Sequence, residues 1–424
     1  MIIAVVGLGH IGLPLAVQYA SRGHRVIGCD VDIRTVNAIN AGTSPHDDEP
    51  ALVERVPQLV ADGLLQATTD DAEGVRQADV VVVIVPVVVD AAREIDFGPI
   101  DAATRDIARG LKPGTLVVYE TTLPVGTTRD RFGPLLENGS GLTLDRDLFL
   151  AFSTERVLVG RVLLDLRSYP KIVGGTSEES TRRAVEFYRA ALDEGTEVRA
   201  VANAETAEMT KLAETTYRDV NIALANEYAR YAAKRGIDVL EVIGAANSQP
   251  YSHIHAPGVG VGGHCIPVYP HFLFNAEPDL RLPPLARAIN EEMGRWTVDL
   301  MRERLGPLAG VRVLVLGVAY RADVREEAFS SAFRLRDELR DAGATVFAHD
   351  PYFEADHLRE LGFEPYDFGA PAPVRAAIVQ AGHEAYRSLD LATIPGLELL
   401  VDGRNVLDRA AVMAAGVAYV GIGH

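Results

Sequence analysis

The sequence has little cysteine, no run of basic residues and no long apolar segment. Cys29 and Cys265 are the only two cysteines among 424 residues, which excludes a disulfide framework and is typical of a reducing compartment. No Cys/His cluster has the spacing of a zinc site, so we expect no metal. No segment approaches the ~20 apolar residues that cross a bilayer, and the start MIIAVVGLGH lacks the basic region of a signal peptide. These absences predict a cytoplasmic protein without membrane contact.

Acidic residues outnumber basic ones by 59 to 41, which gives a formal net charge of −18 at pH 7. This charge repels polyanions unless a local basic patch intervenes, and no Lys/Arg run forms one, so we expect no nucleic-acid partner. An apolar content of 48% with 24% charged residues is ordinary for a globular protein. The length predicts two to three domains of about 150 residues each.

The N-terminus has the pattern of a dinucleotide site. An apolar strand, Met1–Val6, is followed by GLGHIG at positions 7–12 and then by the apolar spacing of a helix. In this context Gly7 makes the tight turn, Gly9 admits a pyrophosphate, and Gly12 packs the helix on the strand. A glycine turn without a ligand is the alternative interpretation of the same motif.

An acidic residue follows the next strand. Arg25–Cys29 is expected to form that strand, and Asp30 stands at its end, about 20 residues past the glycine motif. A carboxylate at this position accepts hydrogen bonds from the ribose hydroxyls and repels a 2′-phosphate. The sequence therefore predicts NAD, rather than NADP, as the cofactor.

Further strands continue the α/β alternation. In an open parallel sheet, residues just past the carboxyl ends of strands face the ligand crevice. Thr122 and Glu155 have this position, although a helix cap or a solvated loop residue is the commoner role of a lone Thr or Glu. The strands expected here are Asp79–Val89, Leu116–Glu120, Phe149–Phe152 and Lys171–Gly175.

The apolar period changes in the middle of the chain. From Ala202 to Gly236 apolar residues recur every three or four positions, which predicts a helix longer than most globular helices. Such a helix bridges domains or pairs with a partner chain. It carries Lys211, which by itself is best read as an exposed helical lysine. A second helix, Pro284–Arg304, carries Arg287 and Asn290.

Between these two helices lies a glycine-rich loop with a cysteine. The stretch 256–272 reads APGVGVGGHCIPVYPHF, with glycines at 258, 260, 262 and 263 directly before Cys265. Glycines let a backbone approach a ligand closely, and a thiol at the end of such a loop is a candidate nucleophile. A buried cysteine that packs as a small apolar residue is the alternative.

The C-terminal part has a second α/β pattern, with a loop that contains Asp323 and Arg325. It lacks a GxGxxG motif, so a second dinucleotide site is not indicated. The expected elements are strands Val311–Val318, Thr345–His349, Val374–Val379 and Leu399–Val401, and helix Ser330–Ala342.

Six blocks, in order along the chain, carry a family resemblance. They are GLGHIGLP, TTLPVGT, ERVLVGRVLLDL with KIVGG, AEMTKLAETTYRDVNIALANE, GVGVGGHC and GVAYRADVRE. Over essentially its full length the chain resembles the UDP-glucose/GDP-mannose dehydrogenase family of NAD-dependent nucleotide-sugar 6-dehydrogenases. The third block and the cysteine loop look most like the branch that acts on UDP-N-acetylhexosamines, particularly N-acetylmannosamine.

The resemblance implies an architecture. It implies two Rossmann-like, doubly wound α/β domains joined by a central helical domain with a long helix, which builds a homodimer in the family. We expect an NAD-binding domain over residues 1–200, a central helical domain with the cysteine loop over 201–305, and a nucleotide-sugar-binding domain over 306–424.

The resemblance also implies a chemistry. The C6 alcohol of a UDP-sugar is oxidised to a carboxylate in two hydride transfers. The cysteine that matches Cys265 attacks the intermediate aldehyde and forms first a thiohemiacetal and then a thioester. Lys211 matches a lysine that stabilises negative charge on the C6 oxygen, and Glu155 matches an acid that assists the attack of water. Thr122 lies beside the nicotinamide, and Arg325 matches an arginine that reaches the active-site cleft.

The remaining expected site residues follow from the same match. The catalytic set is Cys265, Lys211, Glu155, Thr122 and Thr215. The cofactor-binding set is Gly7, Gly9, His10, Ile11, Gly12, Asp30, Arg34, Pro86, Thr122 and Arg325. The substrate-binding set is Glu155, Arg156, Lys211, His255, Gly258, Gly260, Gly262, Arg287, Tyr320 and Arg321.

The chain departs from the family pattern at several positions. Thr215 stands where the family has Asn, Tyr269 where it has Asp, Thr154 replaces the proline of an SPER block, and the PTP turn reads Pro86-Val87-Val88. Thr still donates a hydrogen bond, whereas a tyrosine with a reference pKa of ~10 cannot act as a carboxylate near neutral pH. A UDP- or dTDP-glucose 6-dehydrogenase and a catalytically silent nucleotide-sugar/NAD-binding protein therefore remain as alternatives.

The position of Asp30 generates a prediction on cofactor choice. A tenfold preference corresponds to about 1.4 kcal/mol, and repulsion between the Asp30 carboxylate and a 2′-phosphate is expected to exceed that. We therefore expect kcat/KM for NAD to exceed kcat/KM for NADP by more than tenfold. Steady-state kinetics with both cofactors measure this ratio, and Asp30→Asn is expected to reduce it. Equal kcat/KM values for the two cofactors contradict the prediction.

Overall fold

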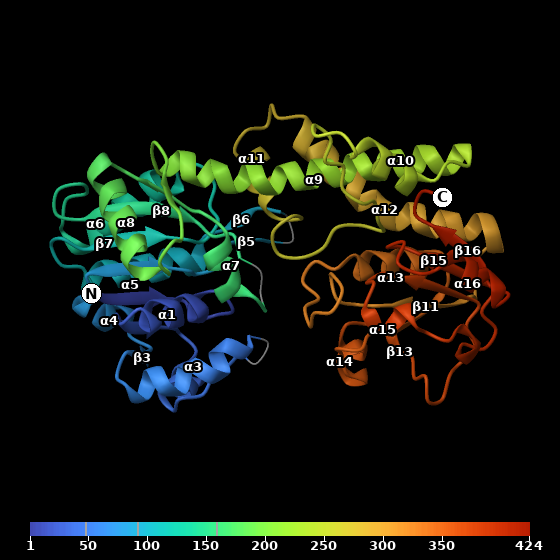
Figure 1. The fold of residues 1–424 in the computed structure, drawn as a ribbon, viewed down its shortest axis with the longest axis horizontal. Coiled ribbons are helices and arrows are strands. Elements are labelled where there is room, and N and C mark those ends of the chain that lie inside the picture. Colours follow the sequence, from blue (N-terminus) through green and yellow to red (C-terminus); the bar gives the residue numbers. More distant parts are fainter. Residues whose placement is uncertain (47–48, 91–92, 158–159) are drawn as a thin grey trace. The chain divides into compact units, whose positions relative to one another are not determined.

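A computed structural model describes residues 1–46, 49–90, 93–157 and 160–424 (Figure 1). It contains two compact units. Unit 1 comprises Met1–Glu214 with His271–Ala276, and unit 2 comprises Thr215–Pro270 with Glu277–His424. The domain boundaries expected near residues 200 and 305 stay a prediction.

Unit 1 is built on an eight-stranded sheet in the order β10-β9-β8-β7-β4-β1-β2-β3. Neighbouring strands run parallel except β8 and β9, which pair antiparallel. The chain order reverses direction between β1 and β4, which is the position where open α/β sheets bind ligands. The strands are β1 (Ile2–Val6), β2 (Arg25–Cys29), β3 (Leu65–Thr68), β4 (Val80–Val83), β7 (Leu116–Tyr119), β8 (Phe149–Thr154), β9 (Lys171–Gly175) and β10 (Val198–Ala200).

The valine run after Asp79 is shorter as a strand than its sequence predicts. The expectation of one strand over Asp79–Val89 is wrong, because β4 ends at Val83. Pro86 follows and has no N–H to continue the ladder. Beyond it, β5 (Val88–Val89) pairs antiparallel with β6 (Ile95–Asp96) as a separate two-stranded sheet.

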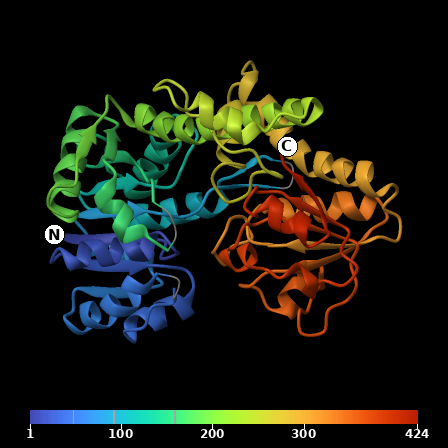
Figure 2. The same cartoon turned by 45° about the vertical axis from the view of Figure 1, so that its right-hand side comes forward.

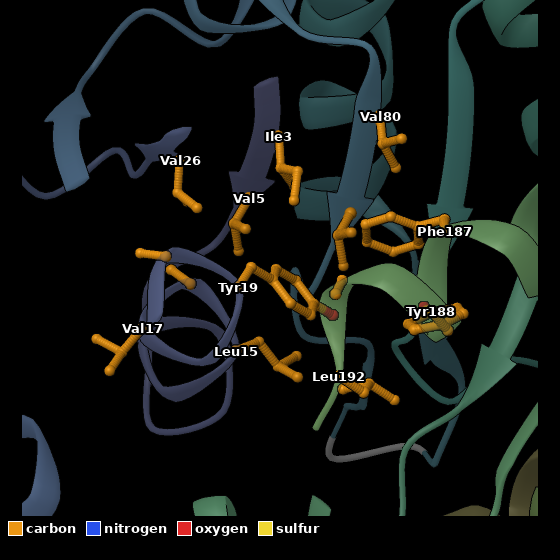
Figure 3. Packing of buried hydrophobic residues seen from close by; sticks show 14 of the residues in the cluster. Ile3, Val5, Leu15, Val17, Tyr19, Val26, Val80, Phe187, Tyr188 and Leu192 are labelled. Atoms are coloured by element: carbon orange, nitrogen blue, oxygen red, sulfur yellow. The ribbon is translucent and has the colours of Figure 1, made fainter. Parts of the chain in front are cut away.

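Helices cover the sheet of unit 1 and close its core. Figure 3 shows side chains of α1, of α8 and of the strands packed in one cluster, among them Val5, Leu15, Tyr19 and Phe187. Strands β4, β7 and β8 are buried along their whole length, as expected for a sheet covered on both faces. The helices are α1 (Gly12–Ser21), α2 (Ile33–Asn40), α3 (Pro50–Ala61), α4 (Asp71–Gln77), α5 (Gly98–Gly110), the π-helical turn η1 (Thr128–Phe132), α6 (Gly133–Ser140), α7 (Val162–Ser168) and α8 (Glu178–Ala191).

The sheet of unit 2 is entirely parallel, in the order β13-β12-β11-β14-β15-β16. Helices flank it on both sides (Figure 2). Its strands are β11 (Arg312–Leu316), β12 (Thr345–His349), β13 (Glu364–Pro365), β14 (Ala376–Val379), β15 (Leu399–Asp402) and β16 (Ala418–Gly421). Its helices are α13 (Ser331–Asp341), α14 (Ala355–Glu360), α15 (Glu384–Arg387), the 3-10 turn η2 (Leu391–Thr393) and α16 (Arg409–Ala414).

The central part of the chain is helical. Helix α9 (Ala204–Arg235) is 32 residues long and matches the long helix that the sequence predicts. It is followed by α10 (Val239–Ala246), α11 (Tyr269–Phe274) and α12 (Leu282–Leu305). Two α/β sheets and a long central helix confirm the predicted fold class. Among the described residues, none of these helices is both long and apolar enough to cross a membrane.

One face of α9 carries apolar side chains that the chain itself leaves exposed. Tyr217, Leu224, Tyr228 and Tyr231 are 54%, 41%, 41% and 60% exposed. Their spacing of seven, four and three residues places them along one side of a helix. Contiguous apolar surface of this kind is typical of protein interfaces.

The same turn follows the first strand of each sheet. Gly7 has φ 93° and donates its N–H to the last carbonyl of β2 at 2.8 Å, and Gly317 has φ 92° and donates to the last carbonyl of β12 at 2.8 Å. The next N–H donates to Asp30 in unit 1 and to Asp350 in unit 2, in both cases at 2.7 Å. The surroundings of the two acids differ, because Asp350 is fully buried with its Oδ2 3.1 Å from Nε2 of His383.

Candidate functional site

The glycine turn after β1 has the space that a dinucleotide requires. A Cβ on Gly7 would lie 2.8 Å from a backbone oxygen of Ile84, and one on Gly12 would lie 1.8 Å from the Gly7 oxygen. Both positions therefore need glycine for packing. Gly9 faces open space, with no atom within 4 Å of its added Cβ. The open side of the turn, at the N-terminus of α1, fits a pyrophosphate.

Asp30 is held in place at the end of β2. Its Oδ2 accepts the Leu8 N–H at 2.7 Å and its Oδ1 accepts the Asp32 N–H at 2.9 Å. Each carboxylate oxygen keeps acceptor capacity, and the residue is half-buried. The adjacent Val31 side chain is 91% exposed. Arg34, by contrast, forms a surface ion pair with Asp32 at 3.0 Å.

The other expected cofactor residues lie around this turn. The His10 ring lies 4.3 Å from the ring of His46, whose Nε2 is 2.9 Å from the Leu8 oxygen. Ile11 packs against the core, and Pro86 lies on the exposed loop after β4. His46 was missed by sequence reasoning, because a lone histidine in a loop carries no pattern.

The threonine loop after β7 is fastened to α9. Thr122 is buried and follows the end of that strand by three residues. A carboxylate that the sequence did not indicate, Glu208, accepts the Gly126 N–H at 2.6 Å and both the N–H and hydroxyl of Thr128 at 2.8 and 2.6 Å. Burial raises the pKa of Glu208 to about 7. Since Glu208 lies one turn before Lys211 on α9, it fixes the loop relative to the helix.

Glu155 and Lys211, two of the predicted catalytic residues, lie together in unit 1. The Lys211 ammonium donates to the backbone oxygen of Glu155 at 2.5 Å. The Glu155 carboxylate accepts the Arg156 N–H at 2.7 Å and contacts the Lys171 ammonium at 2.7 Å. Lys171 was also missed, although it lies within the KIVGG block.

Arg156 is engaged inside unit 1. Its Nη1 donates to Glu214 at 3.0 Å, and its Nη2 donates to the Pro170 oxygen. These contacts hold the segment after β8 against α9 and the start of β9. Its expected contact with substrate stays a prediction.

The cysteine loop is packed closely against the loops of the C-terminal sheet in unit 2. A Cβ on Gly258 would lie 2.7 Å from the Arg404 guanidinium, one on Gly260 2.9 Å from Ser331, and one on Gly262 2.9 Å from Tyr320. Gly260 and the neighbouring glycine at 263 have φ of 144° and 92°. The density of glycines is therefore explained by contact with the protein itself. Contact of these glycines with substrate stays a prediction.

Cys265 leaves this loop at the start of a helical turn. Its sulfur is free and half-buried, and its carbonyl accepts the Tyr269 N–H at 2.9 Å as the chain enters α11. The neighbouring His264 lies 3.3 Å from the Glu326 carboxylate, and this hydrogen bond raises the pKa of His264. His264 is a residue that sequence reasoning missed.

Three expected substrate residues lie on the same side of unit 2 as the loop. Tyr320 packs against position 263, and its hydroxyl accepts from Arg321 at 3.0 Å. Arg404, which sequence reasoning missed, donates to the Gly260 oxygen at 3.1 Å. His255 donates its N–H to Asn221 at 2.9 Å, and burial lowers the pKa of its ring.

The other expected residues of unit 2 differ in exposure. Arg325 is exposed on the loop after β11, whereas Thr215 is buried on α9 one turn past Lys211. Tyr269 is the first residue of α11. Among residues 1–46, 49–90, 93–157 and 160–424, no group of three or more His, Cys, Asp or Glu side chains is arranged to hold a metal ion.

Arg287 is buried in an internal ion pair. It donates from Nε to Asp219 at 2.7 Å, its Nη2 lies 2.6 Å from the second carboxylate oxygen, and the two side chains are 3% and 1% exposed. Asn290 donates to the same carboxylate at 2.7 Å and accepts from Asn226 at 2.8 Å. Asn226 in turn accepts the Gly258 N–H at 2.9 Å. The network links α9, α12 and the cysteine loop.

Comparison with known proteins places the whole chain in one family. Residues 1–192 match the NAD binding domain of the UDP-glucose/GDP-mannose dehydrogenase family, residues 205–292 match its central domain, and residues 314–409 match its UDP binding domain. A UDP-N-acetyl-D-mannosamine dehydrogenase from Pyrococcus horikoshii is 35% identical over 100% of this chain and 99% of its own. One from Salmonella typhimurium is 39% identical over 82% of this chain and 81% of its own. A solved structure of UDP-D-ManNAc dehydrogenase from Pyrococcus horikoshii has a TM-score of 0.90 at 34% identity, and covers 100% of this chain and 99% of that one.

The chain is therefore an NAD-binding enzyme of the nucleotide-sugar dehydrogenase class. It belongs to the UDP-glucose/GDP-mannose dehydrogenase family. The match to the family's UDP binding domain implies a UDP-sugar as substrate. The family and the NAD cofactor that the sequence predicts are confirmed.

The burial of Arg287 generates a prediction on stability. Arg287→Met leaves the Asp219 carboxylate buried without its cation, which is expected to lower the free energy of unfolding by about 3–5 kcal/mol. Urea denaturation of the variant and the wild type measures this change. Arg302→Met, on the exposed side of α12, is the matched control and is expected to change stability by no more than about 0.5 kcal/mol. An Arg287→Met variant with wild-type stability and a raised KM would instead favour direct contact with substrate.

Proposed function

We propose that the protein oxidises the C6 alcohol of a UDP-N-acetylhexosamine, UDP-ManNAc or UDP-GlcNAc, to the uronic acid. Full-length similarity to UDP-N-acetyl-D-mannosamine dehydrogenases carries the proposal. The presence of Cys265, Lys211 and Glu155 at the matching positions supports it. The overall change converts the alcohol, two NAD and one water into a carboxylate, two NADH and three protons.

The cofactor is proposed to lie at the turn between β1 and α1. When bound, NAD accepts the hydride that leaves C6 in each oxidation. Gly9 would leave room for its pyrophosphate, and Asp30 would accept hydrogen bonds from its ribose hydroxyls. The resemblance also assigns His10, Ile11, Arg34, Pro86, Thr122 and Arg325 to this site.

In the first oxidation, Lys211 is the proposed electrostatic catalyst. As the C6 hydroxyl loses its proton and the hydride leaves, negative charge develops on the C6 oxygen. An ammonium next to that oxygen stabilises the charge. The backbone oxygen of Glu155 orients the Lys211 ammonium by the 2.5 Å hydrogen bond.

In the second oxidation, Cys265 is the proposed nucleophile. Its thiolate adds to the aldehyde carbon, and the resulting thiohemiacetal loses a hydride to give a thioester. Water then attacks the thioester carbon, Glu155 accepts one proton from that water, and the C–S bond breaks to release the thiolate and the carboxylic acid, which loses its remaining proton to solvent as the carboxylate.

Two other functions are tested by the same assay. NADH production with UDP-ManNAc, UDP-GlcNAc, UDP-glucose and dTDP-glucose identifies the sugar, and the ratio of NADH to sugar counts the oxidations. A preference for a glucose nucleotide supports the alternative 6-dehydrogenase. Thr215 and Tyr269 favour a silent binder, which is supported if the wild type is inactive on every sugar but Tyr269→Asp with Thr215→Asn restores activity.

The role of Cys265 generates a prediction on stoichiometry. In Cys265→Ser the thioester route is blocked at its first step, because a serine hydroxyl, which is not ionised near pH 7, is a much poorer nucleophile toward the aldehyde than a thiolate. The variant is expected to form at most one NADH per sugar, whereas the wild type forms two. NADH absorbance after complete conversion of a limiting amount of sugar measures this. Cys29→Ser, at the other cysteine, is the control and is expected to keep two NADH per sugar, whereas two NADH at the wild-type rate from Cys265→Ser would make Cys265 structural.

The exposed face of α9 generates a prediction on assembly. We propose a homodimer in which Tyr217, Leu224, Tyr228 and Tyr231 are covered by a second copy, since stable interfaces bury about 1,200–2,000 Å² and are rich in tyrosine. Light scattering at micromolar concentration is expected to give twice 45.7 kDa for the wild type. Tyr228→Glu with Tyr231→Glu is expected to give monomers.

The matched control for assembly is Met413→Glu. This side chain is 56% exposed and lies on α16, a different helix from the one that carries the four exposed apolar residues. The variant is expected to remain dimeric. A wild-type mass near 45.7 kDa contradicts the dimer.

A further inference from the structure

Behind the proposed catalytic acid, unit 1 contains a buried cluster of charged side chains. The Lys171 side chain, at the start of β9, is 4% exposed. Its ammonium lies 2.5 Å from a carboxylate oxygen of Glu120 and 2.7 Å from one of Glu155. Glu120 is fully buried at the end of β7, and Glu155 is 12% exposed. One lysine therefore bridges two carboxylates, only one of which has a proposed role.

Two tyrosines saturate the inner carboxylate. The hydroxyl of Tyr188 donates to the Glu120 Oε1 at 2.5 Å, and that of Tyr19 donates to the same oxygen at 3.2 Å. Figure 3 shows both rings within the apolar cluster, Tyr19 from α1 and Tyr188 from α8. The Lys171 ammonium also lies 5.0 Å from the centre of the Tyr188 ring. Glu120 is thus held by three donors from three elements.

Burying such a cluster lowers the stability of the fold, so its presence suggests a role in function. Burying an ion pair costs several kcal/mol per ion in desolvation, and apolar replacements of buried ionic groups are often as stable or more stable. Here a single ammonium faces two carboxylates. The outer carboxylate is the one that reaches the protein's proposed chemistry. Lys171 and Lys211 hold Glu155 from two sides, the first by its side chain and the second by its backbone oxygen.

We propose that Lys171 is a positioning residue that holds the Glu155 carboxylate in one orientation and in its ionised form, and that Glu120 fixes Lys171 for this task. The proposal rests on the proposed function, because Glu155 acts there as the acceptor of a proton from the attacking water. A protonated Glu155 cannot take that proton. Neither Lys171 nor Glu120 contacts the reacting atoms in this role.

The charges around Glu155 give the direction of the effect. Burial by itself would raise the pKa of Glu155, but the Lys171 ammonium, the hydrogen bond with Glu120 and the Arg156 N–H together hold this pKa below its usual value. Burial raises the pKa of Glu120 to about 7. The charged groups around Glu155 also include the Arg156 guanidinium, engaged by Glu214, the Lys211 ammonium on the Glu155 backbone, and Asp165, which lines the same small cavity and is paired with Arg161.

The phenols stay neutral donors to Glu120. Burial raises the pKa of both Tyr19 and Tyr188 well above its ordinary value. Neither hydroxyl bonds to Glu155, and among the influences that lower the pKa of Glu155 the Lys171 ammonium is the largest, ahead of its hydrogen bond with Glu120. Removing that ammonium leaves burial, which raises the pKa of Glu155, opposed only by the hydrogen bonds with Glu120 and with the Arg156 N–H, so this pKa is expected to rise.

The test is the pH profile of kcat for complete conversion of sugar to uronic acid. In the wild type Glu155 stays ionised from pH 5.5 to 7.5. In Lys171→Met the ratio of kcat at pH 5.5 to kcat at pH 7.5 is expected to fall at least about tenfold below the wild-type ratio, which corresponds to a limb moved by one pH unit or more. The thioester on Cys265 is expected to accumulate at pH 5.5, as detected by mass spectrometry of the intact protein.

Conservative variants separate positioning from structure. Lys171→Arg keeps a cation and is expected to restore the wild-type ratio, since Arg also pairs with carboxylates. Glu120→Gln removes the carboxylate that fixes Lys171 and is expected to lower the ratio, though less than Lys171→Met does, because Lys171 keeps its ion pair with Glu155. If Lys171→Met does not fold, Glu120→Gln carries the test, and a wild-type ratio in Glu120→Gln overturns the proposal.

The remaining outcomes distinguish this inference from the proposed function. A purely structural cluster predicts reduced stability in Lys171→Met with an unchanged pH ratio and no accumulated thioester, which overturns the positioning role alone. A wild type that forms no NADH from any UDP-sugar overturns the proposed function, and the inference falls with it. Wild-type turnover together with the altered ratio supports both.

Discussion

Parallel strands that are buried on both faces leave polar side chains only one place to meet, the edge where the strands end. In unit 1, β4, β7 and β8 are buried at every position. The polar groups of the candidate site accordingly emerge within a few residues of a strand end: Gly9 after β1, Asp30 after β2, Thr122 after β7 and Glu155 after β8. The positions of these four residues are a consequence of the sheet, because each depends on the register of the strand before it.

This constraint explains how far the sequence could be read. Strands β2, β9 and β12 have the bounds that the sequence predicts, and Thr122 and Glu155 lie, as expected, just past the ends of β7 and β8. Their roles in the site stay a prediction. The prediction of one strand over the valine run was wrong because Pro86 interrupts a segment whose composition alone is that of one strand. The reversal of β9 against β8 was not predictable from periodicity, which carries no information on strand direction.

That reversal is what brings Lys171 to the site. In a parallel strand the first residue lies at the edge opposite to the ligand crevice, and a lysine there would be far from Glu155. Because β9 is antiparallel to β8, with Thr154 opposite Ile172, its first residue lies at the carboxyl end of β8. The sequence shows Lys171 plainly in KIVGG, but only the pairing direction reveals its partner. The glycines before Cys265 were likewise visible, while the reason for them, close contact with Ser331 and Arg404, required the packing of unit 2.

The two sheets show how one local device is used in two ways. Both place a glycine with positive φ after the first strand and an acid after the second, and in both the acid accepts an N–H of the turn. In unit 1 the remaining capacity of Asp30 faces outward, beside an exposed Val31. In unit 2 the His383 ring donates to Asp350 from within the protein, and its Nδ1 accepts the Asp323 N–H at 2.9 Å. The second acid thereby anchors, through His383, the loop that carries Arg325, so the geometry that presents the proposed cofactor acid in one unit stabilises a loop in the other.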